Sequence, residues 1–481
     1  MKYLIFLLTS MLINTLFCES VKADTNSTLT EEFKSLIKKH HFTESSLGII
    51  VEDEGKNLLD INAERLMTPA SLTKIVTGGG ILTMIPLNKK FTTNLVSSAE
   101  IKGEKLQGTL CLKGGGDPSF VSEKMWYLVN EFTRTGVKLI AGDLIIDATR
   151  FDAENFDSGR DAKRVDRAFD APISATSFNW NSVNVYVRPG KAGEVAKVFL
   201  DPVNDYLILE NKTKTVSKSG VKGIEVSRVT YKGKDKIIVS GNLSADASEL
   251  VIYKSITNPE MWTGNHLKEF LLQRDIKFTG EIKQGVCPKE ANVLASVQSK
   301  NLNEMTSDML KFSNNFVAEM LVKNLAAEQL IAIGAGAYKS ANMKDGIEFL
   351  KKYLDKIGLN RSSYNLENVS GLTRENKFSA KQLSMVLNSI KNDFLIFPEF
   401  LSGLPIAGMD GTMKNRLKNE DNKNVRAKTG YLDGVVGLAG FVGRPNQSPL
   451  VFVFMFNGNY EMGLAARNLF DDFLFTLNKR N

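Results

Sequence analysis

The pattern of secondary structure changes twice along the chain, and this constrains the fold more than any other feature. Residues 94–290 are dominated by short segments that alternate apolar and polar positions, which is typical of strands. Helical periodicity returns after this stretch, most clearly over 305–328 and 344–357. With 481 residues, the chain is too long for one hydrophobic core. The sequence therefore predicts an α/β domain interrupted by a β-rich insertion.

The two ends of the chain supply the expected α/β domain. Residues 46–60 predict two strands around a turn, and 438–442 and 450–456 predict two more. The last segment, 464–477, carries an apolar stripe at helical spacing. Its acidic residues favour a helix packed on the core over an anchor on a membrane surface.

Residues 1–23 have the layout of a secretory signal peptide, with a positive Lys2, an apolar stretch and a small residue, Ala23, at the cleavage position. A membrane anchor is the alternative, but the apolar stretch is shorter than the roughly 20 residues that span a bilayer. Cys18 could indicate a lipoprotein, but processing of a lipoprotein needs a small residue before the cysteine, and Phe17 is bulky. We expect cleavage after Ala23 and a periplasmic product.

Cysteine and histidine content limits the chemistry. Cys111 and Cys287 form no zinc-binding pattern and are expected in the same insertion domain, either as a disulfide or as two buried thiols. The chain has three histidines, His40, His41 and His266. This small number disfavours a Ser-His-Asp triad and a His-rich metal site. The net charge of +7 is spread without a basic run, so we expect no nucleic-acid partner.

Ser71 and Lys74 form an S-x-x-K sequence at an expected helix start, where Thr68 is a candidate cap. Residues i and i+3 of a helix share a face, so the lysine amine can reach the serine hydroxyl. A serine hydroxyl needs a base to become nucleophilic, and an accessible neutral lysine can serve. The same pattern occurs at Ser35–Lys38 and Ser219–Lys222, without the same context.

Two further short motifs follow Ser71 in order. Ser313 and Asn315 fit S-x-N within an apolar, helical stretch, where polar groups need partners. Lys428, Thr429 and Gly430 form the single K-T-G of the chain, before a predicted strand. A lysine and a threonine on an edge strand can hold a substrate carboxylate, and the glycine permits close approach. S-x-N also occurs at 177–179, 182–184, 299–301 and 363–365, where a turn or cap explains it.

The order S-x-x-K, S-x-N, K-T-G is the signature of serine β-lactamases and penicillin-binding proteins. Over nearly the whole mature length the chain resembles the class-C low-molecular-mass penicillin-binding proteins, the D-Ala-D-Ala carboxypeptidase/endopeptidases. Besides the three motifs, the segments that carry the resemblance are 112–119, 140–144, 178–183, 370–374 and 407–412. No Glu-x-x-Leu-Asn deacylation motif occurs, which disfavours a β-lactamase.

The resemblance implies a transpeptidase-like α/β (α+β) domain, an antiparallel sheet flanked by helices, formed by residues 24–93 and 291–481. Its insertion would hold a second domain, 94–187 with 251–290, and a nested third domain, 188–250. The implied partners are peptidoglycan stem peptides as substrates and β-lactams as covalent inhibitors. The resemblance also implies that the reaction needs no cofactor and no metal.

The resemblance also implies a role for each site residue. Ser71 is the nucleophile, Lys74 the general base and Ser313 the proton relay to the leaving amine. Asn315 positions the substrate amide. Lys428 and Thr429 bind the terminal carboxylate, with Gly430 and Tyr431 completing this strand.

One departure from the family pattern lies in this strand. Tyr431 stands where the family carries Ser or Thr, so a hydroxyl that helps to hold the carboxylate is replaced. The alternative to an active enzyme is a catalytically retired homologue that binds peptidoglycan. The intact Ser71, Lys74, Ser313, Asn315 and Lys428 favour an enzyme.

Overall fold

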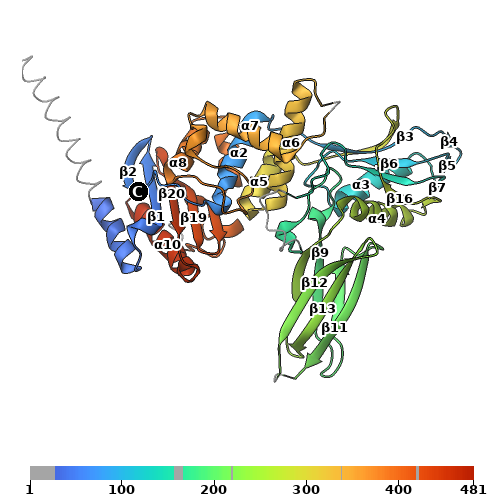
Figure 1. Ribbon diagram of the computed structural model, residues 1–481, viewed down its shortest axis with the longest axis horizontal. Helices are drawn as coiled ribbons and strands as arrows, with labels where there is room; N and C mark the ends of the chain where they lie inside the picture. The colour runs from blue at the N-terminus through green and yellow to red at the C-terminus, as the bar shows by residue number, and fades with distance from the viewer. Residues whose placement is uncertain (1–27, 157–165, 218–219, 337–338, 419–421, 481) are drawn as a thin grey trace, which may run out of the picture.

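Residues 28–156, 166–217, 220–336, 339–418 and 422–480 are described by the structure, a computed structural model. The signal peptide expected at 1–23 lies outside these residues. Figure 1 shows the two ends of the chain, in blue and in orange to red, gathered in one part of the molecule. The middle of the chain forms a second part and a lobe of long green strands that projects from it.

One antiparallel sheet joins the beginning and the end of the chain. Its strand order is β18-β19-β20-β1-β2, and β1 pairs with β20 from Leu47 opposite Phe456 to Glu52 opposite Val451. This confirms the four strands expected at the two ends, and the last predicted helix is α10. The bounds are β1 Leu47–Asp53, β2 Lys56–Ile61, β18 Val425–Leu432, β19 Val435–Arg444, β20 Gln447–Asn457 and α10 Gly463–Lys479.

Both faces of this sheet are covered by helices, which explains why β19 is buried along most of its length. On one face, α10 and the helix of residues 28–39 form an aromatic core in which Phe33 stacks on Phe473 at 4.2 Å between ring centroids. On the other face the remaining helices of this part gather around α2. They are α2 Thr73–Met84, α5 Leu302–Phe312, α6 Asn315–Ala332, α7 Met343–Lys356, α8 Ala380–Lys391 and α9 Phe397–Gly403.

The helix expected over 305–328 is two helices. Ser313 ends α5 in the left-handed conformation, with φ of 55°. Asn314 then caps α6, since its side chain accepts a hydrogen bond from the Val317 amide. Apolar positions recur at helical spacing on both sides of this break, which is why the sequence predicts one helix here.

The insertion has its own core and its own sheets. A five-stranded sheet of order β16-β8-β6-β3-β17 packs against α3 and α4, and a small sheet of order β15-β7-β5-β4 lies beside it. The bounds are β3 Thr92–Ser97, β4 Ile101–Lys102, β5 Lys105–Leu106, β6 Leu110–Lys113, α3 Ser122–Thr133, β7 Leu139–Ile140, β8 Leu144–Asp147, α4 Pro259–Leu272, β15 Lys277–Phe278, β16 Ile282–Gln284 and β17 Asn292–Gln298.

The projecting lobe consists of two three-stranded sheets, β10-β9-β14 and β11-β13-β12 (Figure 1). Its strands are β9 Ser182–Arg188, β10 Lys197–Asp201, β11 Leu207–Val216, β12 Gly223–Tyr231, β13 Lys234–Ser244 and β14 Leu250–Ser255. β17 pairs with β3, so 292–298 lie in the insertion sheet, and β9 and β14 lie in the lobe.

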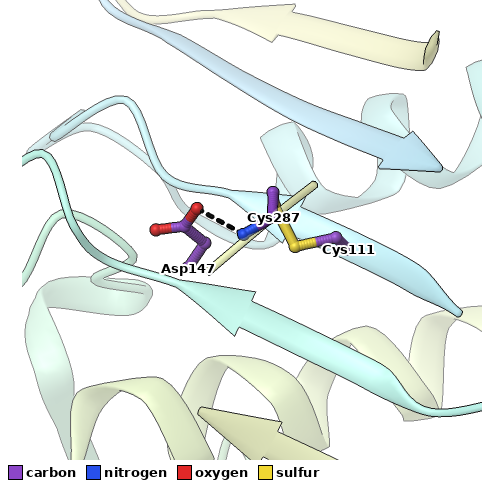
Figure 2. A group of neighbouring side chains, drawn as sticks. All are labelled: Cys111, Asp147 and Cys287. Carbon is purple, nitrogen blue, oxygen red and sulfur yellow. Dashed lines mark hydrogen bonds between the residues drawn. A yellow bond between two sulfur atoms is a disulfide. The ribbon is translucent and has the colours of Figure 1, made fainter. Parts of the chain in front are cut away.

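A disulfide joins Cys111 on β6 to Cys287, which follows β16 (Figure 2). Both cysteines therefore lie in the insertion, as expected. Asp147 at the end of β8 accepts a hydrogen bond from the Cys287 amide at 2.8 Å, and Figure 2 shows it beside the sulfur pair. Because the two sulfurs are bonded to each other, this cluster is a covalent crosslink rather than a pair of thiolate ligands.

Removing this crosslink is expected to destabilise the insertion. The bond closes a loop spanning 176 positions, and losing a native disulfide typically costs about 2–5 kcal/mol. Denaturant unfolding of the oxidised protein, with and without a reductant, measures this loss. A Cys111→Ala/Cys287→Ala double variant should unfold at the same lower denaturant concentration as the reduced protein. Adding the reductant should not change the unfolding midpoint of this variant. Equal stability of the oxidised and reduced protein would contradict the prediction.

Candidate active site

Ser71 lies in a short 3-10 helix, η2 Ala70–Leu72, which leads directly into α2. Ala70 has a φ of 48°, a conformation that a non-glycine residue adopts only when its surroundings hold it. Thr73 helps to hold it, since its hydroxyl donates to the Ala70 carbonyl at 2.8 Å. The expected cap was wrong: the Thr68 hydroxyl donates instead to the Arg374 carbonyl, and no side chain caps this helix start.

Lys74 is fully buried and its amine points back at the nucleophile. Its Nζ lies 3.1 Å from Ser71 Oγ, 2.7 Å from Asn315 Oδ1 and 2.5 Å from the Ser370 carbonyl oxygen. These contacts fix the amine beside the hydroxyl from which a base must take the proton. The i, i+3 geometry expected from S-x-x-K is therefore present.

The break between α5 and α6 places the S-x-N residues at the same spot. Asn315 opens α6, is 8% exposed, and donates through Nδ2 to the Phe169 carbonyl at 3.2 Å. This second contact ties the catalytic part to a segment of the insertion. Ser313 Oγ accepts a hydrogen bond from Lys428 Nζ at 2.7 Å. The helix break thus lets Ser313 and Asn315, two positions apart, contact two different lysines.

The K-T-G residues lie on β18, which is an edge strand as expected. Burial, and repulsion from the Lys74 amine whenever that amine is charged, hold the pKa of Lys428 well below its usual range. Lys428 Nζ also donates to the Thr429 carbonyl at 2.8 Å, and the Thr429 hydroxyl bonds to that of Thr412 at 2.8 Å. A Cβ at Gly430 would lie 2.8 Å from the Pro69 carbonyl oxygen, so only glycine lets β18 approach the nucleophile segment this closely.

Tyr431 is turned toward α10. The Arg467 guanidinium lies 4.5 Å from its ring centroid, and the side chain is 44% exposed. Thr429 and Tyr431 are two positions apart on one continuous strand, so their Cβ atoms share a face. The backbone of residue 431 thus continues the K-T-G strand, while its ring packs against Arg467 of α10.

A loop between α7 and α8 contributes residues that the motif analysis missed. Asn368 Oδ1 accepts hydrogen bonds from the Ser370, Gly371 and Leu372 amides and from the Ser370 hydroxyl, at 2.6–3.1 Å. The Ser370 hydroxyl also lies 3.1 Å from Glu319 Oε1. Asn368 therefore shapes the turn whose carbonyl, that of Ser370, receives the Lys74 amine. In the sequence, Asn368 is one polar residue close to Ser370-Gly371, and no spacing pattern indicates that it shapes this turn.

The competing S-x-x-K sequence at Ser35–Lys38 lies exposed on the helix of residues 28–39, and Ser219 lies outside the described residues. Of the S-x-x-K serines that the structure describes, Ser71 is the one that lies with Lys74, Ser313, Asn315 and Lys428. A serine hydroxyl, a buried amine at hydrogen-bond distance and a second buried lysine suit nucleophilic acyl transfer.

Comparison with known proteins identifies the family that carries this arrangement. The model of the D-Ala-D-Ala carboxypeptidase 3 (S13) family matches residues 29–475. The chain belongs to this family. Membership confirms the family and the fold class predicted from the sequence. It also confirms the enzyme class, a serine-type D-Ala-D-Ala carboxypeptidase of the penicillin-binding type.

Individual S13 relatives align along most of the chain. It is 28% identical over 449 residues to the D-alanyl-D-alanine carboxypeptidase of Actinomadura sp. (strain R39), covering 90% of this chain and 81% of that protein. It is 26% identical to the D-alanyl-D-alanine carboxypeptidase DacB of Haemophilus influenzae, covering 86% of each.

A solved structure confirms the fold of this S13 chain. Penicillin binding protein 4 (dacB) from Haemophilus influenzae superposes with a TM-score of 0.79 at 24% identity, over 92% of this chain and 99% of that one. The same protein complexed with a β-lactam superposes with a TM-score of 0.74. The agreement covers the catalytic part together with the insertion.

Proposed function

We propose that this S13 protein cleaves D-Ala-D-X bonds of peptidoglycan stem peptides through an acyl-enzyme on Ser71, as a carboxypeptidase and endopeptidase. The observation that carries the proposal is the 3.1 Å contact between Ser71 Oγ and Lys74 Nζ, with Lys74 fixed by Asn315 and Ser370. A retired homologue would have no need to maintain this contact among buried groups.

Acylation follows from these positions. Neutral Lys74 takes the Ser71 proton, and Oγ attacks the carbonyl carbon of the penultimate D-Ala. The amide N–H groups of Ser71 and Tyr431 stabilise the oxyanion. When the C–N bond breaks, Ser313 relays to the leaving amine the proton that Lys74 took from Ser71, and Lys74 is neutral again. Water then hydrolyses the ester and regenerates the Ser71 hydroxyl.

Substrate binding falls to the K-T-G strand and to Asn315. Lys428 and Thr429 hold the terminal carboxylate, while the Asn315 side chain positions the substrate amide. Because the two buried amines disfavour charge on each other, protonation of Lys428 on binding the carboxylate would favour the neutral form of Lys74. We propose the same acylation by β-lactams, which is supported by the β-lactam complex of the Haemophilus influenzae protein.

We propose a periplasmic location. The Cys111–Cys287 disulfide supports it, because such bonds persist in oxidising compartments. The leader-like residues 1–23 support it as well. Among the described residues, every helix is too short or too polar to cross a membrane.

Parallel hydrolysis assays test this function. The protein is incubated with a stem pentapeptide and with a cross-linked muropeptide dimer, and D-Ala release and dimer cleavage are followed. We expect turnover of the pentapeptide by the parent and none by Ser71→Ala. Absence of turnover on both substrates would overturn the proposal in favour of a retired homologue.

Replacing Tyr431 with threonine is expected to favour the free D-Ala-D-Ala terminus over the cross-linked dimer. Residue 431 shares a strand face with Thr429, so a threonine hydroxyl there can reach the same carboxylate. A hydrogen bond to a charged group contributes enough for about a ten-fold change in the ratio of the two rates.

Tyr431→Val is the matched control, because valine has the shape of threonine without its hydroxyl. If both variants change the ratio equally, the bulk of the ring and not a missing hydroxyl sets the preference. An unchanged ratio in Tyr431→Thr would mean that the side chain has no part in substrate choice.

A further inference from the structure

The turn between α9 and β18 brings a second threonine to the K-T-G strand. It contains the short 3-10 helix η7, Gly411–Met413. Thr412 of this helix is exposed, and its hydroxyl oxygen lies 2.8 Å from the hydroxyl oxygen of Thr429. Thr412 also ends segment 407–412, one of those that carry the family resemblance. The Thr412 hydroxyl has no role in the mechanism proposed for Ser71.

Several contacts fix this turn against the end of α5. The Asp410 carboxylate accepts hydrogen bonds from the Ile406 amide at 2.8 Å and from Lys311 Nζ at 2.9 Å. A Cβ at Gly411 would overlap the Lys311 carbonyl oxygen, so only glycine permits this approach. Lys311 lies two residues before Ser313. The turn is therefore held by the same end of α5 that presents Ser313 to the K-T-G lysine.

Two hydroxyls at this separation can hold one carboxylate. The hydrogen bond between Thr412 and Thr429 uses one of their two hydroxyl protons, which leaves the other for a further acceptor. A carboxylate has two oxygens and about four acceptor sites, so it can also take both protons. Thr412 is exposed and Thr429 is half-buried, so a ligand can reach the pair from solvent.

The surroundings of the two hydroxyls suit an anion. Lys428 Nζ donates to the Thr429 carbonyl at 2.8 Å and to Ser313 Oγ at 2.7 Å, so an amine and a third hydroxyl lie beside them. The acid of the turn, Asp410, is paired with Lys311 at 2.9 Å. Hydrogen bonds from such donors to a carboxylate are assisted by its charge.

Residue 431 brings no second hydroxyl to this place. Tyr431 follows Gly430 on β18, but it has no hydroxyl on its Cβ, and its ring packs against Arg467 of α10. We propose that Thr412 and Thr429 together hold the terminal carboxylate of the substrate. Thr412 thus supplies the hydroxyl that residue 431 does not. This role of Thr412 rests on the proposed function, because the carboxylate belongs to the substrate that Ser71 cleaves.

Acylation by benzylpenicillin and by its methyl ester tests this role, because the ester lacks the free carboxylate. Both rates are followed by mass spectrometry of the intact protein. Thr412→Val keeps the shape of the side chain and removes the hydroxyl. We expect it to slow acylation by benzylpenicillin about ten-fold, the loss of one hydrogen bond to a charged group, and to leave the rate with the ester unchanged. Thr412→Ser should react as the parent does with both.

Thr230→Val is the matched control, because Thr230 is exposed on the lobe and its hydroxyl lies 3.4 Å from that of Thr257. It should be acylated at the parental rate. Equal slowing with benzylpenicillin and with the ester in Thr412→Val would mean that the hydroxyl only shapes the turn. A parental rate with benzylpenicillin would mean that it does not meet the carboxylate. Either result would overturn the role of Thr412 while the proposed function stands, whereas a parent protein that benzylpenicillin does not acylate would overturn both.

Discussion

In a Lys74→Ala variant we expect penicillin acylation to slow by about 100- to 10,000-fold, the usual contribution of a general base. The reason is the position of the amine, 3.1 Å from Ser71 Oγ and held by Asn315 and Ser370. Stopped-flow or gel-based labelling with a fluorescent penicillin measures the rate. The far-UV circular dichroism spectrum should match that of the parent.

Lys74→Arg separates the two roles that Lys74 can have. Arginine keeps the positive charge but cannot become neutral, so it cannot accept the proton from Ser71. We therefore expect the arginine variant to acylate as poorly as the alanine variant. Parental acylation in either variant would mean that Lys74 is not the base.

A Gly371→Ala variant should lose at least about a hundred-fold in acylation rate, although residue 371 contacts no substrate in the proposed mechanism. Gly371 has a φ of 84°, and a Cβ there would lie 2.0 Å from the Ala70 carbonyl oxygen and 3.0 Å from the Ser71 amide. Something must shift, and the nearest atoms belong to the nucleophile segment. A displacement of about 1 Å in a catalytic group can reduce a rate about a hundred-fold.

Gly358→Ala is the control for this variant. Gly358 has a similar φ of 91°, but no atom lies within 4 Å of a Cβ placed there. Both substitutions pay the conformational penalty of a positive φ, about 1–2 kcal/mol. Only Gly371→Ala should lose acylation, as measured with the fluorescent penicillin. Equal rates in the two variants would show that the close contact with Ala70 does not position Ser71.

Parts of the site whose residues lie within one helix or one strand could be predicted from the sequence, because the spacing along the chain fixes their geometry. Ser71 and Lys74 are three residues apart in one helical stretch, and Lys428 to Gly430 lie on one strand. The ordering of the three motifs then pointed to one chemistry. The two-part architecture followed from the change of periodicity near residues 94 and 290.

Other features depend on contacts between distant segments. Apolar positions recur at helical spacing on both sides of Ser313 and Asn315, so the sequence predicts one helix where the structure has α5 and α6. The role of Asn368 arises from three backbone amides that converge only after the loop folds. The pairing of Cys111 with Cys287, and the place of β17 beside β3, likewise depend on residues far apart along the chain.

The most direct test of Ser71 as the nucleophile is to map the site of penicillin acylation. The protein is labelled with a penicillin, digested, and the modified peptide is sequenced by mass spectrometry. We predict one penicilloyl group per chain on Ser71, and none in Ser71→Ala. A label on Ser35 or Ser219, or labelling that persists in Ser71→Ala, would contradict the assignment of the active site.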